Sequence, residues 1–284
     1  LVECVKINIG GNFIMYKAVV SDLDGTLLNA EHKVSEFTRE TVELLLKKGI
    51  KFYIATGRNY LGAKEAMDEL GVKVPLITSH GSVAFDENGN EIFSNNLKRE
   101  YLDKVLDIDY KSFGKDIIIT GYSGPNWFVT EDLREYFYNK KPDRTRYPQQ
   151  ITSEEFKKQD FTKIFFLGED HNELMELENA IMQAAGEENI SILFASEGSL
   201  EIFSADCSKT KAAKAVLERD GLTLKDAVSF GDGLNDYDLI TQTGLGFAME
   251  NSIYLLLEKL TDTEVIESNT NDGMAKKVRE IFNL

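Results

Sequence analysis

Two aspartates lie one residue apart near the start of the chain, directly after an apolar segment. The stretch VVSDLDGTLLN covers residues 19–29 and contains Asp22 and Asp24. Carboxylates at this spacing repel, and each raises the pKa of the other unless a cation lies between them. If the apolar segment is a strand of a parallel sheet, both acids follow its carboxyl end, where ligands bind in such sheets. The pattern favours a catalytic site over an ordinary polar turn.

A calcium-binding loop is a rival explanation for the sequence Asp-x-Asp-Gly, but residue counting argues against it. The position that requires glycine in such a loop is Leu27 here. The position of the closing glutamate is Lys33. These acids therefore do not begin an EF-hand loop.

A second acidic segment, GDGLND, covers residues 231–236 and follows the apolar stretch AVSF. It places Asp232 and Asp236 after another predicted strand, where two carboxylates suit a hard cation with oxygen ligands. The glycines allow the backbone to turn tightly. A capping role for Asn235 or Asp236 in the following helix is compatible with this interpretation.

The segment ATGR, residues 55–58, follows a further predicted strand. A threonine before glycine can present its hydroxyl and free backbone amides to an anion. Thr56 and Gly57 are therefore candidates for binding phosphate, although a simple turn explains the segment equally well when it is taken alone. Arg58 is consistent both with binding phosphate and with a surface position.

Lys209 begins a predicted helix, where a cation opposes the helix dipole unless an anionic site lies close by. A solvated basic face that includes Lys211 and Lys214 explains the residue when it is taken alone. The combination carries more weight, because the two acid pairs, Thr56 and Lys209 each follow a strand or begin a helix. We therefore expect them to form one site.

The elements that position these residues alternate between strand and helix in two parts of the chain. Apolar stretches predict strands over residues 16–22, 51–55 and 76–78 with helices between them, and the alternation returns from Lys209 onward. Repeated units of this length indicate a parallel sheet covered by helices on both faces.

Between these parts the pattern changes to hairpins. Residues 83–93 contain Asn88-Gly89 at a predicted turn, and residues 116–130 predict a second hairpin. Hairpins with a few helices indicate an antiparallel sheet with helices on one side.

We therefore expect an α/β fold with a Rossmann-like parallel-sheet core that is split in sequence. The core would comprise residues 16–84 and 205–284, and residues 85–204 would form an inserted α+β cap domain. Residues 1–14 would be an N-terminal extension, and a non-native origin is compatible with Met15 as a plausible natural start.

Composition limits the partners of the chain. A net charge of −16 over 284 residues repels nucleic acid and attracts divalent cations. No apolar run is long enough to span a bilayer, and we expect no signal peptide. Cys4 and Cys207 have no metal or redox spacing, which favours reduced thiols in a cytoplasmic protein. The sequence leaves the oligomeric state open.

With these motifs, the sequence resembles the haloacid dehalogenase-like hydrolase superfamily and, within it, the Cof-type phosphatases with a C2B-type cap. The resemblance rests on DLDGT, ATGR, Lys209 and GDGLND, and on the late segments GFAMENS (246–252) and SNTNDGMA (268–275). It spans residues 16–284 and is specific in the core. In the cap only the order of elements matches.

Two positions depart from the pattern of this family. Asn-Gly-Ala is usual after the third strand, and here the residues are His80-Gly81-Ser82. Gly-Asn-Ala is usual near the fourth crossover, and here the residues are Glu250-Asn251-Ser252. His80 would lie near the rim of the site, where it either affects how the leaving group is held or is an exposed turn histidine.

The resemblance implies a mechanism. Asp22 would be the nucleophile that forms an aspartyl-phosphate, and Asp24 the general acid and then the general base. Mg²⁺ would be held by the carboxylates of Asp22 and Asp232 and by the backbone carbonyl of Asp24. Asp236 would orient Lys209 or the water shell of the metal. The remaining candidates are Thr56, Gly57, Lys209 and Asn235 for the phosphoryl group, and Arg58 and His80 for substrate contacts.

The expected function is Mg²⁺-dependent hydrolysis of a small phosphorylated metabolite. Sugar phosphates are the favoured class, followed by phosphorylated cofactors. A sugar phosphomutase is a second enzyme hypothesis. A non-catalytic phospho-sensing module is a third, but such modules lack a large insertion that could enclose a substrate.

Overall fold

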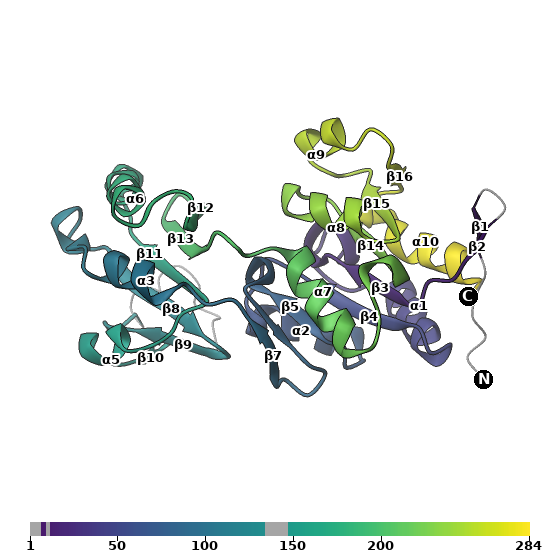
Figure 1. Cartoon of the computed structure of the whole chain (residues 1–284), viewed down its shortest axis with the longest axis horizontal. Helices are drawn as coiled ribbons and strands as arrows, with labels where there is room; N and C mark the ends of the chain where they lie inside the picture. Colours follow the sequence, from purple (N-terminus) through teal and green to yellow (C-terminus); the bar gives the residue numbers. More distant parts are fainter. Residues whose placement is uncertain (1–6, 10–11, 134–146) are drawn as a thin grey trace. The chain divides into compact units, whose positions relative to one another are not determined.

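The computed structural model describes residues 7–9, 12–133 and 147–284 (Figure 1). Cys4 and most of the expected extension over residues 1–14 lie outside the described residues. The described part of the extension is a small antiparallel hairpin of β1 (Ile7–Ile9) and β2 (Asn12–Ile14).

The chain folds into two compact units. The first combines Leu1–Phe93 with Ser208–Leu284, and the second is Ser94–Cys207. The hairpin of β6 (Val83–Phe85) and β7 (Glu91–Ser94), which the sequence pattern groups with the insertion, extends the sheet of the first unit instead. All three residues of β6 are buried, and the strand pairs antiparallel with the core strand β5 (Leu76–Thr78).

The first unit contains an eight-stranded sheet with the order β16-β15-β14-β3-β4-β5-β6-β7. The pairs from β16 to β5 are parallel, as the alternation of strands and helices predicts. The parallel strands are β3 (Ala18–Ser21), β4 (Lys51–Ala55), β5 (Leu76–Thr78), β14 (Ala227–Gly231), β15 (Leu245–Met249) and β16 (Glu264–Ile266).

Helices cover both faces of this sheet (Figure 1). Alternation along β3 directs Val19 into one apolar cluster and Ala18 and Val20 into another. The cluster of Val19 includes residues of α1 (Glu36–Lys47), α2 (Tyr60–Leu70) and α10 (Gly273–Phe282), and the other includes residues of α7 (Lys209–Arg219) and α8 (Tyr237–Gln242). A short helix, α9 (Tyr254–Lys259), follows β15. The prediction of a Rossmann-like α/β core is therefore confirmed.

The second unit has a mainly antiparallel sheet with the order β10-β9-β8-β11-β13-β12. The predicted hairpin over residues 116–130 is present as β8 and β9. Ile164 and Phe166 pack with apolar residues of three helices in one cluster. The elements are β8 (Ile118–Ser123), β9 (Asn126–Val129), β10 (Gln149–Gln150), β11 (Lys163–Leu167), β12 (Ile190–Ser196), β13 (Ser199–Ser204), α3 (Arg99–Leu106), α5 (Ser153–Lys157) and α6 (His171–Ala185).

Among the described residues, no helix has both the length and the apolar character needed to cross a bilayer.

Candidate active site

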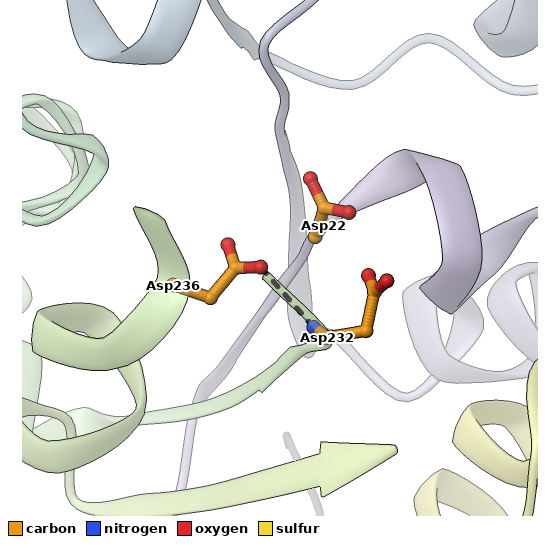
Figure 2. Close-up of side chains that lie close together, drawn as sticks. All are labelled: Asp22, Asp232 and Asp236. Atoms are coloured by element: carbon orange, nitrogen blue, oxygen red, sulfur yellow. Dashed lines mark hydrogen bonds between the residues drawn. The ribbon is translucent and has the colours of Figure 1, made fainter. Parts of the chain in front are cut away.

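The two acidic segments meet because their strands are neighbours in the sheet. Phe230 of β14 lies opposite Ser21 of β3, and the backbone N–H of Asp22 donates to the carbonyl of Phe230 at 3.0 Å. Asp22 and Asp232 therefore leave the same edge of the sheet, and Figure 2 shows their carboxylates beside each other. One oxygen from each of Asp22, Asp232 and Asp236 lies within 4.8 Å of the other two.

Lys209, the first residue of α7, completes this cluster of acids. Its ammonium donates to Asp22 Oδ1 at 2.5 Å and to Asp236 Oδ1 at 2.8 Å, and its side chain is only 1% exposed. Burial lowers the pKa of Lys209, but the carboxylates of Asp22 and Asp236 outweigh burial and raise it above its ordinary value. Lys209 is therefore a fixed cation in the site.

Asp236 holds the loop and the lysine in place. Its Oδ2 accepts from the backbone amides of Asp232 at 3.1 Å and Gly233 at 3.0 Å, and the first of these bonds is drawn in Figure 2. Its other oxygen accepts from Lys209. Both oxygens are thus engaged by the protein, which suits an orienting role better than a direct role in chemistry.

Asp232 is oriented by the segment that follows Asp22. Its Oδ1 accepts from the Thr26 hydroxyl at 2.9 Å. Gly25 passes so close that a Cβ atom there would lie 2.3 Å from Asp232 Oδ2, and its φ of +79° also favours glycine. Thr26 belongs to the DLDGT motif, and its role in orienting Asp232 is a functional contact that the sequence pattern did not predict.

The charges of the cluster do not balance. Burial raises the pKa of Asp22 and of Asp232, and the nearby Asp236 carboxylate raises both further, while Lys209 opposes the rise. Three carboxylates face one ammonium, so the ionised cluster has two negative charges in excess. A divalent cation with oxygen ligands fits both the donor set and the excess charge.

Asp24 lies outside this cluster. Its carboxylate accepts from Arg58 Nε at 2.7 Å and from Arg58 Nη2 at 2.5 Å, a two-point contact of the kind that arginine makes with carboxylates. His32 Nδ1 lies 3.5 Å from the same carboxylate. Arg58, a sequence candidate for substrate contact, is therefore bonded to the expected acid–base residue in this structure.

The ATGR segment lies at the end of β4, next to β3. The Thr56 N–H donates to the carbonyl of Ile77 at 2.8 Å, and its hydroxyl accepts from the Arg58 N–H at 3.1 Å. A Cβ atom on Gly57 would lie 2.5 Å from His80 Cε1. The imidazole of His80 thus packs against the backbone of Gly57, and a larger residue here would displace the ring.

His80 and Asn235 come together from distant parts of the sequence. His80 lies in a short turn over Ser79–Gly81, and its Nδ1 is 3.2 Å from Asn235 Nδ2. The structure thus joins two candidates that the sequence analysis treated separately. Asn235 precedes Asp236, so this contact borders the acidic cluster.

Comparison with known proteins identifies the family. A family model described as haloacid dehalogenase-like hydrolase matches residues 19–278. The chain belongs to the haloacid dehalogenase-like (HAD) hydrolases. The resemblance derived from the motifs is confirmed.

Similar HAD proteins cover nearly the whole chain. A protein of Buchnera aphidicola subsp. Baizongia pistaciae (strain Bp), named "Putative phosphatase", is 35% identical over 94% of this chain and 99% of its own length. An HMP-PP phosphatase of Yersinia pestis is 28% identical over 92% of this chain and 93% of its own. A solved HAD subclass IIB sugar phosphatase has a TM-score of 0.70 and 21% identity, with 93% and 98% covered. The prediction of a HAD-like phosphatase is confirmed.

The late segments of this HAD hydrolase hold the acidic loops together. Asn251 Nδ2 donates to the carbonyl of Gly25 at 2.8 Å, and the backbone N–H of Ile253 donates to the carbonyl of Asp232 at 3.1 Å. Asn269 donates its backbone N–H to Asn251 Oδ1 at 2.9 Å. Asn251 and Asn269 belong to the motifs quoted for the resemblance, and Ile253 directly follows the first of these motifs. No spacing rule reveals these contacts, because each one involves a backbone atom.

Proposed function

We propose that this HAD phosphatase uses Mg²⁺ to hydrolyse phosphate monoesters of small metabolites through an aspartyl-phosphate on Asp22. The observation that carries the proposal is the buried cluster of three aspartates and one lysine, with its two excess negative charges. A balanced ion pair would need no further ligand, whereas this cluster is stabilised by a divalent cation.

The residues that would hold the ion are Asp22 and Asp232 through their carboxylates and Asp24 through its backbone carbonyl. The chemistry that the ion supplies is screening of the negative charges on the carboxylates and on the phosphoryl oxygens. The Thr26 hydroxyl bond and the close approach of Gly25 orient the Asp232 carboxylate without the ion.

Asp22 would act as the nucleophile. Its carboxylate oxygen forms a bond to phosphorus while the bond from phosphorus to the ester oxygen breaks. Lys209 fixes the orientation of this carboxylate through Oδ1 and neutralises part of the charge that gathers on the phosphoryl group. Thr56, Gly57 and Asn235 would bind the phosphoryl oxygens from the neighbouring loops.

Asp24 would move the protons. As an acid it donates a proton to the departing ester oxygen, and as a base it accepts a proton from the water that attacks the aspartyl-phosphate. The attack of that water releases inorganic phosphate and restores the Asp22 carboxylate. Because both oxygens of the Asp24 carboxylate are bonded to Arg58, this ion pair must open before Asp24 can reach the departing ester oxygen.

Small sugar phosphates are the substrate class that we favour. A solved neighbour in fold is named a sugar phosphatase, and a relative is named an HMP-PP phosphatase, so both act on small phosphorylated compounds. The leaving group is the part of the substrate that a phosphate-release screen identifies.

The test is a phosphate-release screen with MgCl₂ across sugar phosphates, phosphorylated cofactors and an aryl phosphate. We expect release from at least one small monoester, loss of release in EDTA, and no turnover by Asp22→Asn. If Asp22→Asn still releases phosphate, Asp22 is not the nucleophile. Conversion of a sugar phosphate to its isomer without release of phosphate would indicate a mutase instead.

A further inference from the structure

The turn that carries His80 has an unusual backbone. Ser79 has φ of 50° and His80 has φ of 58°, so two consecutive residues other than glycine lie in the left-handed region. Side chains with a Cβ atom avoid this region because the atom crowds the following carbonyl. Such a conformation persists only where surrounding contacts impose it, and it occurs often at functional sites.

The contacts that impose it come from the phosphate-binding loop. The Ser79 N–H donates to the carbonyl of Arg58 at 2.7 Å, and the His80 N–H donates to the carbonyl of Thr56 at 3.1 Å. The turn is therefore fixed to both sides of Gly57. This arrangement places the imidazole against Gly57, where a Cβ atom would lie 2.5 Å from the ring.

The same arrangement places His80 Nδ1 at 3.2 Å from Asn235 Nδ2. An amide NH₂ group can only donate, so His80 Nδ1 is the acceptor in this contact. Asn235 Oδ1 lies over Gly233, where a Cβ atom would come within 2.6 Å of it. The bond to His80 thus orients the amide, and its second N–H can donate to another acceptor.

We propose that His80 is a positioning residue that holds the Asn235 amide in the orientation that binds the phosphoryl group. The inference rests on the proposed function, since it requires a phosphate between Asp22 and Asn235. His80 acts through Asn235 and needs no contact with the substrate. This role explains why a left-handed histidine is kept at a position where glycine would relieve the backbone.

Two substitutions distinguish the effect of the imidazole from the effect of the backbone conformation. His80→Gly removes the imidazole and suits the positive φ, so the turn is not strained further. His80→Asn tolerates the same φ and provides an acceptor, Oδ1, attached to Cγ as Nδ1 is in histidine. Asn283→Gly is a matched control, because Asn283 also has positive φ (49°) and lies at the end of α10.

The experiment measures the affinity for inorganic phosphate by calorimetry in MgCl₂, together with kcat and KM. We expect His80→Gly to weaken phosphate binding about three- to tenfold, the size of one hydrogen bond. His80→Asn should restore binding to within about twofold of the wild type, since it keeps the acceptor. Asn283→Gly should bind phosphate like the wild type.

A double-mutant cycle with Asn235→Ala decides whether His80 acts through Asn235. We expect the double variant to bind phosphate no more weakly than Asn235→Ala alone. Additive losses, unchanged binding in His80→Gly, or failure of His80→Asn to restore binding would each overturn the inference. If the wild type and Asn283→Gly still release phosphate in those cases, only the role of His80 is wrong and the proposed function is unaffected. If the wild type releases no phosphate, the proposed function itself is wrong.

Discussion

Two buried lysines, one in each unit, differ in the number of acids that surround them. Lys163 of the second unit pairs with one acid, Glu201, at 2.9 Å, and its ammonium lies 5.9 Å from the ring centres of Tyr122 and Phe165. Lys209 of the first unit bonds to two carboxylates, and Asp232 adds a third acid to its cluster. The pair of Lys163 and Glu201 has no net charge, whereas the ionised cluster around Lys209 has two negative charges in excess.

The comparison shows how a structural ion pair differs from a ligand site. Removing charges from water costs free energy, and a partner of opposite charge must repay that cost. The pair of Lys163 and Glu201 repays it within the protein. The cluster around Lys209 does not, so we expect its folded state to gain from a bound cation. Burial is common to both lysines, and the excess of negative charge is what distinguishes the cluster of Lys209 from an ion pair.

The largest effect should come from breaking the unbalanced cluster. We expect Lys209→Met to lower kcat by about 10²- to 10³-fold, because a preorganised charge next to the phosphoryl group is lost. Steady-state phosphate release measures this effect. A kcat within tenfold of the wild type would contradict the role of Lys209, and circular dichroism checks that the variant is folded.

Breaking the balanced pair should lower stability instead. We expect Lys163→Met to reduce the free energy of unfolding by about 2 to 3 kcal/mol, somewhat less than for a fully buried pair because Glu201 is partly exposed. Urea unfolding measures the change. The double variant Lys163→Met/Glu201→Gln removes the unpaired charge and should recover part of the loss. If Lys163→Met is as stable as the wild type, the pair does not stabilise the second unit.

Magnesium should stabilise variants that keep the acidic cluster and have little effect on a variant that lacks one of its acids. At ten times its dissociation constant, Mg²⁺ should stabilise the folded wild type by about 1.4 kcal/mol. Lys163→Met should gain the same amount, while Asp232→Asn should gain much less. Urea unfolding with MgCl₂ or with EDTA measures the difference. An equal gain in Asp232→Asn would place the ion elsewhere.

The smallest effect is a dependence on pH without metal. Because burial raises the folded-state pKa of Asp232, its carboxyl contributes stability that is present below the unfolded pKa of about 3.9. This contribution is lost as the pH rises through the folded pKa. In EDTA, Asp232→Asn should therefore become progressively more stable than the wild type as the pH increases. If the difference in unfolding free energy between Asp232→Asn and the wild type stays constant as the pH rises above about 3.9, the pKa of Asp232 is not raised.

The sequence predicts the strand ends of this site better than their pairing. Asp22 and Asp232 could be placed after strands because each follows a buried apolar segment. Their contact depends on β3 and β14 being neighbours, although Thr26 and Asp232, which share a hydrogen bond, are 206 positions apart. Local periodicity carries no information on such long-range pairing. The expectation of one site came from the combination of motifs and from the family resemblance.

Side-chain partners within the loops were harder to predict. The bond between Asp24 and Arg58 depends on the backbone angles of two loops, and the acceptors of Asn251 and Ile253 are carbonyl groups common to every sequence. The hairpin of β6 and β7 shows a related limit. Its turn was predicted from Asn88-Gly89, but a hairpin pattern does not specify which sheet its edge joins.

The order of the chain has a consequence for its synthesis. Lys209 lies 187 positions after Asp22, and the whole of Ser94–Cys207 comes between the two parts of the first unit. At roughly 5 to 20 residues per second, a ribosome needs about 10 to 40 s to pass from Asp22 to Lys209. During that time the nascent chain contains Asp22 without the ammonium that bonds to its carboxylate. Residues 94–207 have an apolar core of their own and are made before Lys209, so the second unit can fold while the first is incomplete. The cluster of acids forms only after β14 has been made.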